Sequence, residues 1–131
     1  ERDALRFVQR NGKLRNVLTP RVPGLAAEYA QRVLDAELPL RGLAREDIAA
    51  WIWHAGGKRV LAAVETAVGL SPRDMEPSRT VLREYGNLSS AFVYFVLQQA
   101  LRERRKPGWW WMSSFGAGFS CHGALLRASA A

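Results

Sequence analysis

The sequence has 131 residues, 48% of them hydrophobic and 24% charged, and 19 Lys and Arg against 12 Asp and Glu give a net charge of +7. These values are typical of one folded domain with a core, and they exclude a disordered tail, a collagen-like fibre and a disulfide scaffold. No segment reaches the roughly 18 to 20 uninterrupted apolar residues of a membrane-spanning helix. The chain begins with charged residues, without an initiator Met or a signal peptide. We therefore expect a soluble, cytoplasmic protein without a membrane span, as a piece of a longer chain.

The first half of the sequence alternates between strand and helix signals. Two short β-prone stretches surround Asn11-Gly12, which predicts a hairpin over residues 4–19. Apolar residues then recur at helical spacing over 25–40, after Pro20 and Pro23. A short apolar strand over 48–53 leads through Gly56-Gly57 into a helix over 58–68 that Gly69 ends. A strand, two glycines and a helix in this order form half of a βαβ unit.

The second half predicts two helices and a second pair of strands. Ser71-Pro72 marks a turn or a helix start, and residues 77–85 form a short helix that ends at Gly86. A helix over 87–104 follows, with Asn and Ser side chains to cap it; because it is apolar on every side, we expect it to be buried. Residues 109–115 and 119–127 are strands on either side of a glycine-rich turn. The predicted order, ββαβαααββ, indicates an α/β domain with layers of helices on a sheet.

One basic cluster follows the 87–104 helix, and it consists of Arg102, Arg104, Arg105 and Lys106. Cations at the end of a helix interact favourably with the helix dipole, so a solvated helix end is the favoured interpretation. A small anion such as phosphate is the alternative that stays open. We expect no nucleic-acid partner.

The two histidines and the cysteine give no metal site, because their spacing matches no usual ligand set. His54 follows a strand and precedes two glycines, where α/β folds gather active-site groups, although a histidine that only orders the turn is an equal alternative. His122 lies within a strand, and we interpret it as structural. Cys121 and His122 cannot form a catalytic pair, because adjacent strand residues point to opposite faces.

Asn87 is the second candidate, since it lies between Gly86 and the start of a helix, where negative charge is favoured. An Asn that caps a helix is the common alternative. A side-chain amide and an imidazole directed at one point would both donate hydrogen bonds and could hold an oxyanion or an enolate.

Three segments, in order, resemble motifs of the chalcone and stilbene synthase family, the type III polyketide synthases. The first is similar to the family's Trp-x-x-His-Pro-Gly-Gly, the second to its Ser-Arg-x-Val-Leu-x-Glu-Tyr-Gly-Asn-Met-Ser-Ser-Ala and the third to its Phe-Gly-Pro-Gly-Leu-Thr. In this sequence they read Trp53-His54-Ala55-Gly56-Gly57, residues 78–91, and Phe115-Gly116-Ala117-Gly118-Phe119-Ser120. The resemblance covers about residues 5–128, but only the C-terminal half of such an enzyme.

The resemblance implies the C-terminal half of a thiolase-like fold, a mixed β-sheet with packed helices, as one domain over 1–131. It also implies a homodimeric acyltransferase that joins malonyl-CoA to an acyl-CoA starter by decarboxylative Claisen condensation, as in chalcone synthase. No cofactor is expected beyond the CoA thioester substrates. The nucleophilic cysteine belongs to the family's N-terminal half, which this chain does not contain, and Cys121 does not occupy its position. We therefore expect no condensing activity from this chain alone.

The resemblance also assigns site residues. His54 and Asn87 would be the two arms of an oxyanion hole. Ser89 would line the substrate cavity, which the loop Gly116, Ala117 and Gly118 would shape. Gly56, Gly57 and Arg59 would lie along the CoA arm, and a phosphate contact by Lys58 or Arg59 is our own hypothesis. Ala55 and Ala117 stand where the family has prolines, which affects loop rigidity and cavity shape more than the fold.

Three alternatives remain at this stage. A ketoacyl-ACP synthase of the initiating type shares the fold and the His/Asn pair, but its histidine is followed by Gln-Ala-Asn, whereas His54 is followed by Ala55, Gly56 and Gly57. A binding module that uses the basic surface would need neither His54 nor Asn87. A non-catalytic interaction fragment would expose apolar surface and self-associate.

Overall fold

The computed structural model describes residues 3–130, so Glu1, Arg2 and Ala131 of the expected 1–131 domain lie outside it. The order of strands and helices is the predicted one, and the fold class, α/β with a mixed sheet, is confirmed. The elements are β1 (Leu5–Arg10), β2 (Lys13–Leu18), α1 (Val22–Leu40), β3 (Ile48–Trp53), α2 (Lys58–Val68), α3 (Pro72–Tyr85), α4 (Phe92–Arg102), β4 (Gly108–Gly116) and β5 (Ser120–Ala128), with single 3-10 turns over Arg45–Asp47 and Ser89–Ala91.

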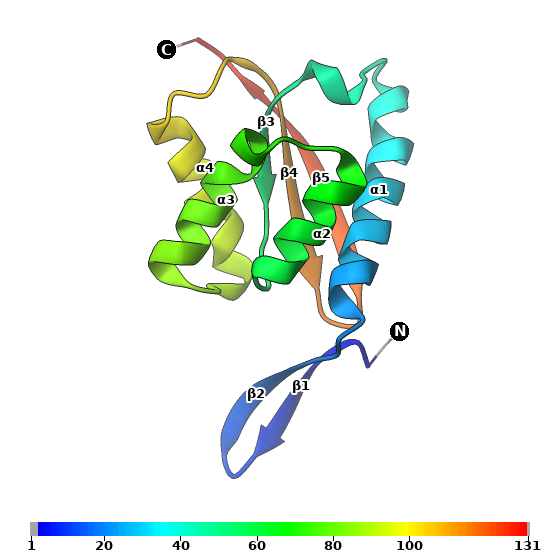
Figure 1. Cartoon of the computed structure of the whole chain (residues 1–131), viewed down its shortest axis with the longest axis vertical. Helices are drawn as coiled ribbons and strands as arrows, with labels where there is room; N and C mark the ends of the chain where they lie inside the picture. The colour runs from blue at the N-terminus through cyan, green and yellow to red at the C-terminus, as the bar shows by residue number, and fades with distance from the viewer. Residues whose placement is uncertain (1–2, 131) are drawn as a thin grey trace.

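The first two strands form the predicted hairpin, which extends away from the rest of the molecule (Figure 1). Asn11 and Gly12 at its tip have φ of 52° and 72°. Positive φ at both central residues matches the twist of the strands, and this is why an Asn-Gly pair is favoured there. At its base, the N–H of Gly118 donates to the carbonyl of Leu5 at 2.9 Å, so the hairpin is tied to the loop between β4 and β5.

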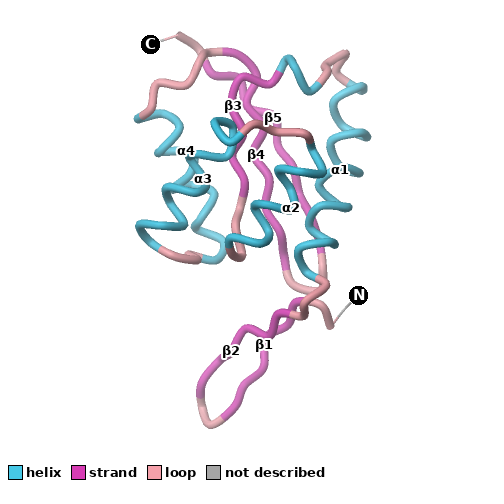
Figure 2. Tube along the Cα trace, in the orientation of Figure 1, coloured by secondary structure: helices cyan, strands magenta, loops and turns pink. Residues whose placement is uncertain are grey.

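The main sheet has the order β3-β4-β5 (Figure 2). β3 runs parallel to β4, and β4 runs antiparallel to β5. The path from β3 to β4 passes through α2, α3 and α4, so the predicted half of a βαβ unit is confirmed as the start of a longer crossover. β3 is buried along nearly its whole length, and α3 and α4 both contact it, while α1 contacts β5. The Trp109–Trp111 run lies in β4 and packs on the core, with Trp110 and Trp111 buried.

Two helices begin earlier than the sequence predicted. α1 starts at Val22, because Pro23 falls in the first turn, where a missing N–H has no cost. α3 starts at Pro72 and continues through Pro77, the residue at which the sequence predicted its beginning. Ser71 caps α3 reciprocally with Asp74, and the Pro77 side chain is fully buried. Burial in the core therefore outweighs the cost of about 3 kcal/mol that proline carries inside a helix.

The helix after Asn87 also differs from its prediction. A 3-10 turn over Ser89–Ala91 precedes α4, and no side chain caps α4 at Ala91. The expectation that this helix is buried on all sides is wrong, because Tyr94 is 65% exposed and Leu101 is 58% exposed. Only one face of α4 contacts the sheet, and the other face carries apolar side chains at the surface. Within residues 3–130, no helix is long and apolar enough to cross a membrane.

Candidate active site

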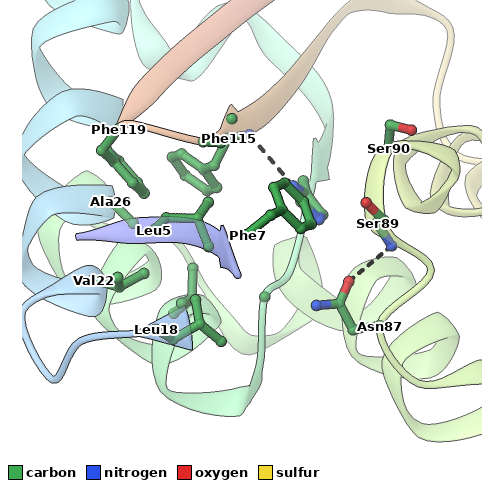
Figure 3. Close-up of a pocket in the computed structure, with 15 residues that line it drawn as sticks. Leu5, Phe7, Leu18, Val22, Ala26, Asn87, Ser89, Ser90, Phe115 and Phe119 are labelled. Carbon is green, nitrogen blue, oxygen red and sulfur yellow. Dashed lines mark hydrogen bonds between the residues drawn. The ribbon is translucent and has the colours of Figure 1, made fainter. Parts of the chain in front are cut away.

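A cavity of about 190 Å³ opens where the hairpin, the end of β3, the segment before α4 and the β4–β5 loop meet (Figure 3). It brings together residues from widely separated parts of the sequence, including the predicted His54, Gly56, Asn87, Ser89, Gly116 and Ala117. Its other walls are mainly apolar and are formed by Leu5, Phe7, Leu18, Val22, Ala26, Val60, Phe115 and Phe119, with Ser90 beside Ser89.

His54 is held at the carboxyl end of β3. Its backbone N–H donates to the carbonyl of Ser113 at 2.9 Å, which continues the β3–β4 pairing by one residue. Its Nδ1 accepts the N–H of Phe115 at 3.4 Å, so the neutral ring carries its proton on Nε2. That Nε2 atom is buried and makes no hydrogen bond of normal geometry with residues 3–130. The ring therefore presents its Nε2 donor at the cavity that the Asn87 side chain also lines.

The electrostatic environment of His54 favours this neutral form. Burial lowers the pKa of His54 below its ordinary value, and the side chain of Asn87 acts in the opposite direction. The rings of Phe92 and Phe115 lie beside the imidazole, with centroids 5.7 and 6.3 Å away. The aromatic surroundings hold the ring without supplying a polar partner for Nε2.

Asn87 lies in the short segment between α3 and the Ser89–Ala91 turn. Its Oδ1 accepts the N–H of Ser89 at 2.9 Å, which orients the amide and leaves the Nδ2 amino group as a donor (Figure 3). Ser89 has a φ of 55°, a conformation that non-glycine residues rarely adopt. Asn87 thus orders the turn, as the capping alternative proposed, and it also lines the same cavity as His54.

Two of the three predicted residues of the β4–β5 loop line the cavity. Gly116 and Ala117 line it, whereas Gly118 uses its N–H to bind the hairpin at Leu5. The rings of Phe115 and Phe119, on either side of the loop, are stacked with centroids 5.6 Å apart. Gly118 therefore positions the loop against the hairpin, and it is not among the lining residues.

The hairpin and α1 also contribute to the cavity, which was not predicted from the sequence. Leu5 and Phe7 lie two residues apart on β1, so they share one face of the strand, and both line the cavity with Leu18 of β2. Phe7 is still 52% exposed. The apolar residues Leu5 and Phe7, two positions apart, indicated that one face of this strand packs against other residues. The sequence of the hairpin did not indicate which part of the fold that face would meet.

A second cavity of about 420 Å³ adjoins the first and contains the predicted Gly56, Gly57 and Arg59, together with Lys58. The two cavities share four lining residues, namely Leu18, Val22, Gly56 and Val60. Lys58 and Arg59 are exposed, and no carboxylate lines this second cavity. A continuous surface therefore runs from His54 to two cations.

Cys121 and His122 lie apart from this site. The thiol of Cys121 is 3.4 Å from Ser113 Oγ, and the His122 ring is 3.2 Å from Ser120 Oγ, so the two side chains do not pair. Burial raises the pKa of the Cys121 thiol, and the hydrogen bond with Ser113 lowers it by a smaller amount. The net rise disfavours the thiolate. Residues 3–130 contain no cluster of His, Cys, Asp and Glu that could hold a metal ion.

Comparison with protein families gives one match over most of the chain. The family model described as chalcone and stilbene synthases, C-terminal domain, matches residues 8–130. Curated relatives include two 3,5-dihydroxyphenylacetyl-CoA synthases. That of Amycolatopsis orientalis is 37% identical over 112 residues, which are 84% of this chain and 30% of that protein. That of Streptomyces toyocaensis is 33% identical over 129 residues, 95% of this chain and 33% of that protein. The chain thus spans about a third of the length of these relatives.

Solved structures with the same arrangement include two polyketide synthases. The polyketide synthase PKS-I of the brown alga Ectocarpus siliculosus superposes with a TM-score of 0.88 at 27% identity, over 98% of this chain and 36% of that one. The 1,3,6,8-tetrahydroxynaphthalene synthase of Streptomyces coelicolor A3(2), a bacterial type III polyketide synthase, gives 0.88 at 26% identity, over 99% of this chain and 38% of that one.

Proposed function

Because the chain belongs to the chalcone and stilbene synthases, as their C-terminal domain, and has the thiolase-like fold of type III polyketide synthases, we propose that it forms the oxyanion-binding half of a type III polyketide synthase active site. The observation that carries this proposal is that His54 and Asn87 line one cavity. His54 offers Nε2–H and Asn87 offers its Nδ2 amino group to that space.

Two hydrogen-bond donors aimed at one point are suited to a reaction that develops negative charge on an oxygen atom. In decarboxylative condensation, the bond between the malonyl α-carbon and its carboxylate breaks and carbon dioxide leaves. The electron pair passes to the thioester carbonyl, whose oxygen becomes an enolate oxygen. His54 and Asn87 would donate hydrogen bonds to that oxygen. The apolar walls of the cavity exclude water and strengthen both hydrogen bonds.

The enolate carbon would then attack the thioester that carries the growing chain, and a carbon–carbon bond would form as the thiolate leaves. Because Cys121 does not line the cavity that contains His54 and its burial disfavours the thiolate, we assign the nucleophilic cysteine to the rest of a longer protein. A neutral His54 beside that cysteine could accept its proton and hold the thiolate. This chain alone is then expected to be inactive.

The adjoining cavity supports the predicted path of the CoA arm. Gly56 lines both cavities, Gly57 lines the adjoining one, and the exposed Lys58 and Arg59 follow them. Acyl-CoA and malonyl-CoA, which carry phosphates at the far end of a narrow arm, match a passage with cations at its mouth. We propose Arg59 as a phosphate contact.

The identity of the product is also part of this proposal. The curated relatives are named for a CoA thioester of a dihydroxylated aromatic acid. We propose such a product, and chalcone formation is the alternative that a starter panel distinguishes. Decarboxylation supplies the electron pair, so the chemistry calls for no cofactor. A cytoplasmic homodimer remains our expectation.

The test uses the complete protein that contains this chain, incubated with malonyl-CoA alone and with a panel of acyl-CoA starters. Mass spectrometry would measure polyketide products and released carbon dioxide. His54→Ala and Asn87→Ala should each lower kcat by about 100-fold or more, because each removes one oxyanion donor. His122→Ala, at an exposed histidine outside the cavity, is the matched control and should remain active. Turnover that survives both site substitutions would exclude this mechanism. Products formed only from carrier-protein thioesters would favour the ketoacyl-ACP synthase alternative.

A further inference from the structure

A third hollow, lined mainly by charged residues, lies at the opposite end of the sheet from His54. It has a volume of about 350 Å³ and is lined by Ala49, Arg73, Asp74, Glu103, Arg104, Arg105 and Lys106. In Figure 1, the loop that follows α4 and the first turn of α3 both lie at the end where β3 and β4 begin. Ala49 is five residues before His54, which corresponds to about 16 Å along an extended strand. The hollow is thus separate from the cavity that contains His54.

The two carboxylates of this hollow are already engaged. Asp74 Oδ2 accepts the backbone N–H of Ser71 at 2.9 Å and its hydroxyl at 2.7 Å, as part of the α3 cap. Glu103 Oε2 binds Arg105 through Nε at 2.8 Å, and its Oε1 accepts from Gln99 at 3.0 Å. Arg105 is therefore neutralised by Glu103.

The other three cations of this hollow make no ion pair in the described part of the chain. Within residues 3–130, the side chains of Arg73, Arg104 and Lys106 make neither an ion pair nor a hydrogen bond. Arg73 moreover lies in the first turn of α3, where a cation opposes the positive end of the helix dipole. Arg104 has a φ of 49°, so the backbone takes an uncommon conformation in the segment that brings Arg104 and Lys106 to the hollow. Like charges gathered around a concave surface repel one another unless an anion binds between them.

We propose that this hollow is a binding site for a diphosphate group, either as free pyrophosphate or as part of a nucleotide. Arg73, Arg104, Arg105 and Lys106 outnumber Asp74 and Glu103 by two charges, so the hollow has a net positive charge that favours an anion. The volume lies within the range of small-ligand sites. The guanidinium groups of Arg73 and Arg104 suit phosphate oxygens, which they bind in bidentate fashion. The site is independent of the proposed condensation chemistry.

The experiment is calorimetric titration of the complete protein with pyrophosphate, ADP and inorganic phosphate at fixed ionic strength. We expect one saturable site for pyrophosphate, with weaker binding of phosphate. The double substitution Arg104→Gln/Lys106→Gln should weaken pyrophosphate binding at least about tenfold, since it removes two charged contacts. Pyrophosphate should also raise the melting temperature of the unsubstituted protein and not that of the double variant, because binding to the folded state stabilises it.

Controls separate this site from general charge effects and from the CoA passage. Arg10→Gln/Lys13→Gln removes the same two charges from the exposed hairpin tip and should leave pyrophosphate binding unchanged. Arg59→Ala should also leave it unchanged. Equal weakening in the hairpin variant, or loss of binding in Arg59→Ala with retention in Arg104→Gln/Lys106→Gln, would overturn the proposal. Equal affinity for phosphate and pyrophosphate would overturn its diphosphate part. ADP binding as tight as that of pyrophosphate would identify a nucleotide as the source.

Discussion

The hydroxyl of Ser78 makes two hydrogen bonds to the backbone of Trp53, the residue before His54. It accepts the Trp53 N–H at 3.1 Å and donates to the Trp53 carbonyl at 2.9 Å. β3 pairs with β4 on one side only, so Ser78 of α3 completes the hydrogen bonding of its other edge at this residue. Ser78 is fully buried, and no water can replace its hydroxyl without repacking. The position of His54 therefore depends on α3 as well as on the sheet.

Ser78→Ala is expected to lower the free energy of unfolding by about 1 to 3 kcal/mol, because it leaves a buried N–H and a buried carbonyl without partners. Urea denaturation would measure this change. Ser129→Ala, at an exposed serine near the end of the chain, is the control and should leave stability unchanged. A Ser78→Ala protein as stable as the unsubstituted one would show that the edge of β3 is satisfied in some other way.

Two glycines near β5 should respond differently to alanine. A Cβ on Gly123 would lie 2.2 Å from the ring of Trp111, which is buried and cannot move aside, so Gly123→Ala should cost about 1 to 3 kcal/mol or more. A Cβ on Gly116 would meet only the hydroxyl of Ser120, at 2.6 Å, which can rotate away. Gly116→Ala should therefore be clearly less destabilising. Thermal unfolding of the two variants side by side tests the order, and the reverse order would contradict the packing described for Trp111.

Stability should fall on mild acidification because of His54. The unfolded chain binds a proton on this residue near pH 6.5, whereas burial lowers the pKa of His54 in the folded state. Between those two values the unfolded state holds more protons, so the free energy of unfolding decreases as the pH falls below about 7, until the folded group also protonates. His54→Gln should flatten this part of the pH profile. Since the Asn87 side chain raises the pKa of His54, Asn87→Ala should lower that pKa further, as NMR titration of the ring would show. A rise would contradict the effect assigned to Asn87.

Phe7 is expected to limit the size of the product. It lines the cavity from β1 and is half-exposed (Figure 3), so Phe7→Ala should enlarge the space at little cost in stability. We expect the complete enzyme to shift toward longer chains or bulkier starters, as measured by mass spectrometry of the products. Phe95→Ala, the same change on the outer face of α4, is the matched control. An unchanged product distribution would show that Phe7 does not limit the size of the product.

Arg59→Ala should raise the dissociation constant for CoA esters several-fold, because one charge-assisted phosphate contact is lost. The effect should diminish at high salt, since Arg59 is exposed. Fluorescence or calorimetric titration of the complete enzyme would measure it, with Arg32→Ala on α1 as a control for loss of charge. If the dissociation constant stays the same in Arg59→Ala, the contact is not made.

The local signals in the sequence predicted most of the fold. Asn11-Gly12, Gly69 and the apolar run over 48–53 each specify their element through backbone conformation or burial, which neighbouring residues determine. The errors occurred where tertiary contacts prevail. Burial of Pro77 continues α3 through a proline, and the outer face of α4 stays exposed although its residues are apolar.

The candidate site was predicted in part. The resemblance to three motifs identified His54, Asn87 and the loop at Gly116, and the fold brings these into one cavity. Phe7 and Leu18 were not foreseen, because the place where a hairpin folds back depends on the long-range bond between Gly118 and Leu5. The residues at Arg104 were predicted as a basic cluster at a helix end, with a small anion as the open alternative. Arg73 was not foreseen beside them, because it is 31 residues away in sequence and reaches the hollow through the fold.

The parallel pairing of β3 with β4 has a consequence for how the protein is made. β4–β5 is a local hairpin that forms quickly, but β3 must wait for β4, which follows three helices later in the chain. The contact between Phe115 and His54 joins residues 61 positions apart. When synthesis has reached the end of α4, the four α-helices and β3 have been made, but β4, β5 and the Phe115 N–H that binds the His54 ring have not. The active site of this half is therefore assembled only when the β4–β5 hairpin emerges. Premature termination before β4 would leave β3, which contains Trp51 and Trp53, without its partner strand and prone to aggregation.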